Sequence, residues 1–204
     1  MTADERRQQI IDKAAALFDS ESYSSTSMDD IAAAIGIAKP TLYHYFPSKA
    51  QILFDIHEEL IDTLLARHEE RVRKHLRPRE WLLEIMEDIL EFMQTRPGHM
   101  RVFFEHYREL PEEQRDIIQV KRDHFQEILE DLLAEGVRVG DFRPMDVRLT
   151  SFEIFGACIW AYQWYVPGGR LETQEIARYF WNNVINGIGS AASVPAMDGS
   201  VPQE

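Results

Sequence analysis

Several side chains that can contact nucleic acid are crowded into residues 39–45 of the 204-residue chain. They are Lys39, Thr41, Tyr43, His44 and Tyr45. Lysine and tyrosine side chains can bind phosphate oxygens, and a threonine can reach a base edge. Aromatic side chains exposed on so short a segment need a partner, so the pattern indicates a DNA-reading surface.

The elements around this segment predict a helix-turn-helix. Ser27 supplies a hydroxyl cap for a helix over residues 27–35, and Gly36 ends that helix. A short turn leads into a second helix over 39–45, and two helices joined by a glycine-containing turn form this motif. The side chains expected to face inward are Ile31, Ala32, Ile35, Ile37, Leu42 and Phe46, packed against Leu17 and Phe18.

The rest of the chain has the apolar spacing of amphipathic helices, with residues recurring at intervals of three and four. No run alternates as a strand would, so the predicted fold class is all-α with about nine helices. The expected ranges are 4–21, 27–35, 39–45, 48–75, 79–95, 98–109, 111–135, 145–165 and 173–189. The expected domains are a three-helix DNA-binding domain at 1–50, a helical effector-binding and dimerisation domain at 51–190, and a disordered tail at 191–204.

Composition limits the function classes. Apolar residues make up 45% of the chain and charged residues 28%, which suits a folded globular protein. The net charge of −13 argues against a generally basic nucleic-acid coat or a polybasic membrane binder, although not against a small DNA-reading surface. No apolar run is long enough to cross a membrane, no signal-peptide core is present, and Cys158 is the single cysteine. We therefore expect a cytoplasmic protein.

Catalytic and metal-binding patterns are weak. His99 and His106 share a helical face but lack a third ligand at the spacing of a zinc site. Nucleotide-binding glycine loops and the hydrolase Gly-x-Ser-x-Gly motif do not occur. Cys158 is expected to be a small core residue, since its helix is apolar. We therefore predict no enzyme activity, no catalytic residue, no metal site and no cofactor.

The run from Thr26 to Lys49, TSMDDIAAAIGIAKPTLYHYFPSK, resembles the DNA-binding signature of the TetR family of bacterial transcriptional repressors. The resemblance covers roughly residues 6–55 and implies that Lys39 opens a recognition helix in the major groove. Ala38 stands where the family often has a serine cap. The DNA-binding residues that the resemblance implies are Thr26, Ser27, Lys39, Pro40, Thr41, Tyr43, His44, Tyr45 and Lys49.

Residues 79–165 are rich in methionine and aromatic side chains, which suit either a core or an adaptable apolar pocket. In the TetR family the ligand pocket lies in this helical region. The candidate ligand-binding residues are Phe103, His106, Tyr107, Phe125, Phe155, Trp160 and Trp164, with His106 and Tyr107 as the orienting pair. Residues 160–169, WAYQWYVPGG, also resemble a TetR branch that senses acyl-coenzyme A thioesters, although Gln163 and Val166 stand where that branch can show arginines.

The two expected helices at 145–165 and 173–189 carry apolar side chains at helical spacing, and Gly187 permits close approach. Two such helices from each of two chains can form a four-helix interface with two-fold symmetry, while packing within one chain is the alternative. The candidate dimer-interface residues are Phe152, Ile159, Ile176, Phe180, Val184 and Ile188.

Together these features predict a homodimeric repressor that binds double-stranded operator DNA and has no membrane partner. A bulky hydrophobic small-molecule effector, of fatty-acyl or acyl-coenzyme A type, is expected to release it. The expected helix at 48–75 would carry the effect of the ligand to the recognition helices. A helical ligand carrier or enzyme that does not bind DNA is the alternative, and residues 26–49 argue against it.

Overall fold

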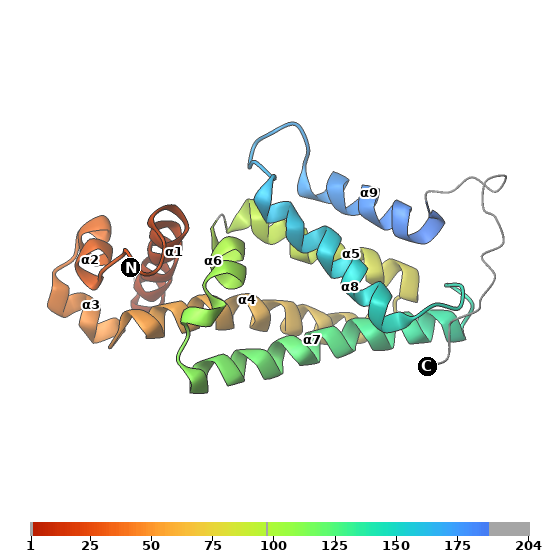
Figure 1. Cartoon of the computed structure of the whole chain (residues 1–204), viewed down its shortest axis with the longest axis horizontal. Coiled ribbons are helices and arrows are strands. Elements are labelled where there is room, and N and C mark those ends of the chain that lie inside the picture. Colours follow the sequence, from red (N-terminus) through yellow and green to blue (C-terminus); the bar gives the residue numbers. More distant parts are fainter. Residues whose placement is uncertain (1, 97, 188–204) are drawn as a thin grey trace, which may run out of the picture.

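The computed structural model of the chain describes residues 2–96 and 98–187, and this part is helical without strands (Figure 1). The all-α prediction is therefore confirmed. The α-helices are α1 (Ala3–Glu21), α2 (Met28–Ile35), α3 (Lys39–Tyr45), α4 (Lys49–Val72), α5 (Pro78–Thr95), α6 (His99–Glu105), α7 (Glu112–Arg138), α8 (Val147–Trp160) and α9 (Thr173–Asn186). Two short 3-10 helices, η1 (Tyr107–Glu109) and η2 (Ala161–Gln163), follow α6 and α8. The expected tail at 191–204 lies outside the described residues.

Two predicted helices are interrupted, and the prediction of one continuous helix was wrong in each case. The expected helix at 98–109 leaves α geometry at His106, whose backbone (φ −106°, ψ 9°) departs from the helical range, and resumes as η1. The expected helix at 145–165 tightens into η2 after Trp160. Such 3-10 turns are frequent at the ends of α-helices.

Local caps explain the helix ends around the motif. The Ser27 hydroxyl accepts a hydrogen bond from the backbone N–H of Asp30, and the Asp30 carboxylate accepts one from the backbone N–H of Ser27. Gly36 ends α2 with φ of +77°, a conformation that glycine adopts without strain. Ala38 gives α3 no side-chain cap, and Pro40 in the first turn favours helical geometry there.

We call α1, α2 and α3 the head, and α4 to α9 the body. The head stands at one end of the molecule, and α4 runs from it along the length of the body beside α7 (Figure 1). On the other side of α4 lie α5, α8 and α9, with α5 packed against α9. The buried side chains of the head include Ile10, Ala14, Phe18, Ile31, Leu42 and Phe46, and they belong to one hydrophobic cluster that continues into the body.

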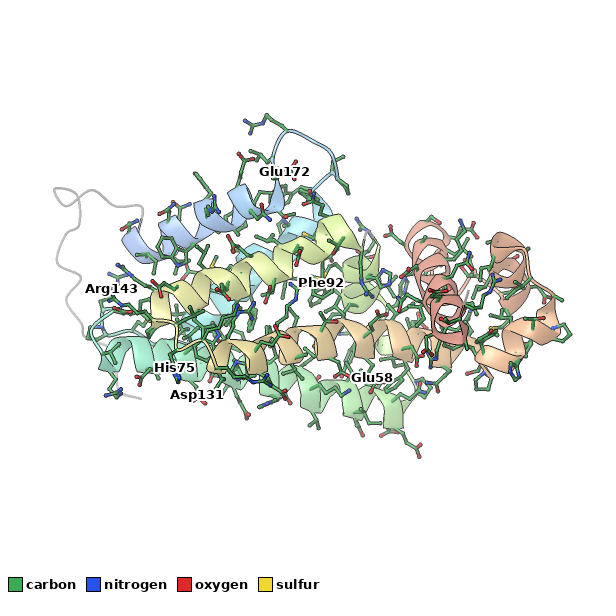
Figure 2. The ribbon with its side chains drawn as sticks, turned by 180° about the vertical axis from the view of Figure 1, so that it is seen from behind. Glu58, His75, Phe92, Asp131, Arg143 and Glu172 are labelled. Atoms are coloured by element: carbon green, nitrogen blue, oxygen red, sulfur yellow. The ribbon has the colours of Figure 1, made fainter. Side chains whose placement is uncertain are left out.

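Ion pairs tie α4 to its neighbours in the body. Figure 2 shows Glu58 where α4 faces α7, and Lys121 of α7 donates to the Glu58 carboxylate at 2.7 Å. On the α5 side, the buried Arg71 guanidinium binds Glu84 at 2.8 Å and also pairs with Asp88. These contacts fix α4 to both flanking helices along most of its length.

The head and the body meet through α6 as well as through α4, because α6 packs against both α1 and α4. The His106 ring lies with Nε2 3.2 Å from the carbonyl oxygen of Phe18. Arg101 binds Asp19 of α1 at 2.8 Å. A displacement of α6 would therefore act directly on α1.

Candidate nucleic-acid interface and effector cavity

The α3 helix exposes most of its side chains. Leu42 is its one fully buried residue, and it anchors the helix on the head core. The exposed side chains are Lys39, Pro40, Thr41, Tyr43 and His44, while Tyr45 is half-buried. The predicted recognition residues thus form one polar and aromatic surface.

Lys39 links the two helices of the motif. Its ammonium lies 2.8 Å from the Asp29 carboxylate of α2, and this hydrogen bond and the negative charge raise the pKa of Lys39. Both side chains are exposed, so the pair adds little to stability and leaves the lysine free to exchange partners. Lys39 is therefore charged and can reach a phosphate if DNA lies on this surface.

The side chains of Thr26 and Lys49 both bind backbone carbonyls of the loop before α2. The Thr26 side chain is buried, and its hydroxyl donates to the carbonyl oxygen of Ser22 at 2.9 Å. The Lys49 ammonium donates to the carbonyl oxygens of Tyr23 at 2.6 Å and Thr26 at 2.7 Å, and partial burial lowers the pKa of Lys49. Both residues hold the loop before α2, so a phosphate contact by either stays a prediction.

A cavity of about 250 Å³ lies in the body between α4, α5, α6, α7 and α8. Three of the predicted ligand-binding residues line it, namely Phe103, Phe125 and Phe155. Two residues predicted for the dimer interface, Phe152 and Ile159, also line it. Most of the wall is apolar, and its polar members are Gln119, Arg122, Asp123 and Gln126.

The other four predicted ligand-binding residues do not line this cavity. His106 contacts the head, as described above, and the Tyr107 hydroxyl donates to the Gln119 side chain at 2.9 Å. Trp160 is 62% exposed and Trp164 is 45% exposed. The predicted orienting pair therefore stands beside the cavity, at its junction with the head.

The sequence places Arg122 among the polar residues near the expected pocket but does not single it out for ligand binding, and among the described residues it is the one arginine in the cavity wall. Its guanidinium lies 4.8 Å from the ring centre of Tyr107, 5.1 Å from that of Phe103 and 5.6 Å from that of Phe104. Burial lowers the pKa of Arg122, and the charges of Tyr107 and Asp123 partly oppose this shift. In the sequence Arg122 has no distinguishing signal, since an arginine on a long helix is normally solvated.

His57 of α4 was also missed, and it stands on the head side of the same aromatic cluster. Its ring centre lies 5.0 Å from that of Phe103 and 6.1 Å from that of Tyr107. The side chain is fully buried, and neither ring nitrogen has a hydrogen-bond partner among the described residues. Burial, helped by the charges of Arg122 and His106, lowers the pKa of His57 to about 3, so the ring is neutral at pH 7.

The predicted dimer-interface residues divide between the surface and the core. Phe152 is 48% exposed, whereas Ile176 is buried within the chain, where α9 packs on α5. Ile159, Phe180 and Val184 are half-buried, and Ile188 lies outside the described residues. Other large apolar side chains are exposed along α8, the following segment and α9, namely Leu149, Trp160, Trp164, Val166 and Tyr179.

Neither a metal site nor a reactive thiol is visible in the part of the chain that the structure describes. No group of three or more metal-ligating side chains gathers there. Cys158 is buried, and desolvation raises the pKa of its thiol to about 12, which keeps it protonated at neutral pH. Among the described helices, none is both long enough and apolar enough to cross a bilayer.

Comparisons with known proteins agree with this architecture. The HTH-type transcriptional repressor KstR2 of Mycolicibacterium smegmatis is 28% identical over 185 residues, which cover 90% of each chain. PfmR, a TetR family transcriptional regulator from Thermus thermophilus, is 30% identical with a TM-score of 0.83, over 89% of this chain and 100% of that one. AibR, solved in complex with isovaleryl coenzyme A and operator DNA, is 28% identical with a TM-score of 0.77, over 88% and 98%.

Family profiles cover both parts of the molecule. One described as "Bacterial regulatory proteins, tetR family" matches residues 10–56, which hold most of the head and the start of α4. One described as "Tetracyclin repressor-like, C-terminal domain" matches residues 75–188, more than half of the chain. These matches decide against the alternative of an enzyme or a carrier without DNA binding. The chain belongs to the TetR family of DNA-binding transcriptional regulators.

Proposed function

We propose that this protein is a homodimeric repressor that an acyl-type hydrophobic small molecule releases from its operator. The observation that carries the proposal is the cavity of about 250 Å³, whose wall includes side chains of α6, the helix that contacts the head. The relatives KstR2, a repressor, and AibR, solved with isovaleryl coenzyme A and operator DNA, support the same reading.

The DNA-binding part of the proposal rests on the α3 surface. Thr41 and His44 are exposed and can reach base edges, while Lys39 and Tyr43 can bind phosphates. The net charge of −13 gives no general attraction to DNA, so the attraction must come from the α3 surface. A single α3 surface supplies few positive charges. A homodimer doubles the contacts, and its two α3 helices must stand about 34 Å apart to enter successive major grooves.

Coupling between the two sites would run through α6. Met100, Phe103 and Phe104 project from α6 into the cavity wall. The same helix and the residue after it hold α1 through Arg101 and His106. A ligand that shifts α6 would therefore move the head and change the spacing of the two α3 helices. A 100-fold preference of the ligand for the shifted state would bias the equilibrium by about 2.7 kcal/mol per site.

The proposal is tested by measuring operator binding with fluorescence anisotropy while acyl-coenzyme A thioesters of increasing chain length are added. Coenzyme A alone and the matching alcohols serve as controls. We expect the thioesters to weaken DNA binding in a chain-length-dependent manner. Tighter DNA binding, or an equal effect of coenzyme A alone, would contradict release by an acyl-type ligand.

A variant separates ligand response from DNA binding. Phe155→Trp adds volume at the cavity wall, far from the exposed surface of α3. We expect this variant to bind the operator with nearly unchanged affinity and to respond weakly to the ligand. A parallel loss of DNA binding would show that the cavity and the head are not separable in this way.

A further inference from the structure

The wall of the cavity contains one cation, Arg122, that pairs with no carboxylate in the part of the chain that the structure describes. Four other partly or fully buried arginines each bind a carboxylate, namely Arg67, Arg71, Arg96 and Arg101. Arg122 has no ion pair with any described residue. Its neighbour on α7, Lys121, binds both Glu58 and Asp62 on the outer side of α4. Carboxylates of α4 thus neutralise Lys121, whereas no carboxylate of the described residues neutralises Arg122, which lines the cavity.

The aromatic rings around Arg122 stabilise its charge only in part. Tyr107, Phe103 and Phe104 lie within cation–π distance of the guanidinium. Rings do not satisfy the in-plane N–H donors of a guanidinium, whereas a carboxylate accepts two of them in parallel. The nearby Asp123 carboxylate accepts a hydrogen bond from Gln119 at 2.6 Å and forms no ion pair with Arg122. The donors of Arg122 are therefore available to a ligand.

The remaining wall suits a short apolar chain. Leu64 and Ile89 on one side and Phe125 and Phe155 on another offer no charge. A volume of about 250 Å³ holds on the order of ten non-hydrogen atoms, since a water molecule occupies about 30 Å³. Such a cavity fits a medium-length acyl chain.

We infer that the cavity binds its ligand as a medium-chain carboxylate, with the carboxylate on Arg122 and the alkyl chain among the apolar side chains of α4, α5, α7 and α8. The inference rests on the proposed function and sharpens it, because a thioester carries no charge at its acyl end. Arg122 then distinguishes an acid from its neutral derivatives. The buried neutral ring of His57 packs against Phe103, with the two ring centres 5.0 Å apart.

The test measures ligand binding by isothermal titration calorimetry without DNA, at pH 7.5, with octanoate, methyl octanoate, octanoyl-coenzyme A and coenzyme A. The variants are Arg122→Gln and Arg122→Lys. Arg138→Gln is the matched control, because Arg138 is exposed on the same helix and distant from the cavity wall. Circular dichroism establishes that each variant is folded.

We expect wild type to bind octanoate about tenfold more tightly than methyl octanoate, since charge-assisted hydrogen bonds are stronger than neutral ones. Arg122→Gln should remove this difference, Arg122→Lys should keep part of it, and Arg138→Gln should keep all of it. Equal binding of acid and ester by wild type would overturn the inference even if Arg122→Gln failed to fold. An equal loss of both ligands in Arg122→Gln would also overturn it.

Two further outcomes separate the inference from the proposed function. If octanoyl-coenzyme A binds and releases DNA while octanoate does neither, the carboxylate site is overturned and the acyl-responsive repressor stands. If octanoate binds in an Arg122-dependent manner but no acyl ligand alters operator binding, the carboxylate site stands and the proposed release mechanism fails.

Discussion

The head and the body present their functional residues in opposite ways. In the head, a continuous stretch of sequence forms α2, the turn and α3, and the residues that can contact DNA point outward from α3. In the body, five helices spread over residues 49–160 each contribute part of an inward-facing cavity wall. A surface of local origin tolerates change at its exposed positions and depends on a small core beneath it. A cavity assembled from distant segments depends on how the helices pack.

The largest effect that this contrast predicts concerns the buried side chains beneath the exposed surface of the head. Phe46 is fully buried and packs where the head joins α4, with the Arg7 guanidinium 4.5 Å from its ring centre. We expect Phe46→Ala to lower the free energy of unfolding by about 3–5 kcal/mol, because it leaves a cavity that the short helices cannot close. Urea denaturation followed by circular dichroism at fixed protein concentration measures this change.

The control for Phe46→Ala is Tyr43→Ala, on the exposed surface of the same motif. Tyr43 is 44% exposed, so its loss should change the free energy of unfolding by no more than about 0.5 kcal/mol. Similar losses in the two variants would contradict the division of the head into a buried part and an exposed surface.

The second prediction concerns pH and the body. His57 has a pKa of about 3 in the folded chain, while an unfolded histidine has a pKa near 6.5. Below pH 6.5 the unfolded chain therefore binds a proton at His57 that the folded chain does not bind. The free energy of unfolding decreases as the pH falls from 6.5 toward 3. His57 therefore lowers the free energy of unfolding by about 2 kcal/mol between pH 7.5 and pH 5.

A His57→Met variant isolates this contribution. The decrease in unfolding free energy between pH 7.5 and pH 5 should be about 2 kcal/mol smaller in His57→Met than in wild type. The matched control is His44→Met, on the exposed surface of α3. An identical pH dependence in wild type and His57→Met would show that the ring is not held neutral.

The contrast also explains what could be predicted from the sequence. Caps, glycine stops and apolar periodicity act over a few residues, so most of the helices and the helix-turn-helix could be predicted from the sequence alone. Apolar type alone does not say whether a residue meets a core, a cavity or solvent. Trp160 and Trp164 are aromatic like Phe125 and Phe155, yet they are exposed. Their positions depend on where α8 ends, which tertiary packing decides.

Charged residues show the same limit. Arg122 and Lys121 are neighbours in sequence, but one faces the cavity and the other binds acids on α4. Lys49 resembles a phosphate-binding lysine in sequence, and its carbonyl partners appear only when the loop from Tyr23 to Thr26 folds back on it. Neither assignment follows from spacing along one helix, because each depends on a partner from another segment.

The third prediction compares the same change, glycine to alanine, at one position in the head and one in the body. Gly36 ends α2 with φ of +77°, and an added Cβ would touch nothing within 4 Å, so its cost is that of the backbone alone. We expect Gly36→Ala to lower the free energy of unfolding by about 1 kcal/mol. Gly156 lies inside α8 without a positive φ and also has open space, so Gly156→Ala should raise it by about 0.5–1 kcal/mol.

Thermal and urea denaturation of the two glycine variants, measured side by side, give the signs directly. A stabilising Gly36→Ala would contradict the left-handed end of α2. A destabilising Gly156→Ala would contradict the open space on that face of α8 and would indicate that a second copy covers it closely.

The smallest expected effect concerns the charge of the α3 surface. Lys39 is exposed and its pair with Asp29 is weakly held, so the ammonium can exchange a carboxylate for a phosphate when DNA binds. Each phosphate contact contributes about 0.9 to the slope of log affinity against log salt. We expect Lys39→Gln to reduce that slope by about one unit per subunit. Between 50 and 200 mM salt, the variant should then lose about threefold less affinity for DNA than wild type for each contact removed.

Lys74→Gln, beyond the far end of α4, is the control and should leave the slope unchanged. Anisotropy titrations at several salt concentrations measure the slope for both variants. An unchanged slope in Lys39→Gln would show that the DNA-facing surface of the head lies elsewhere.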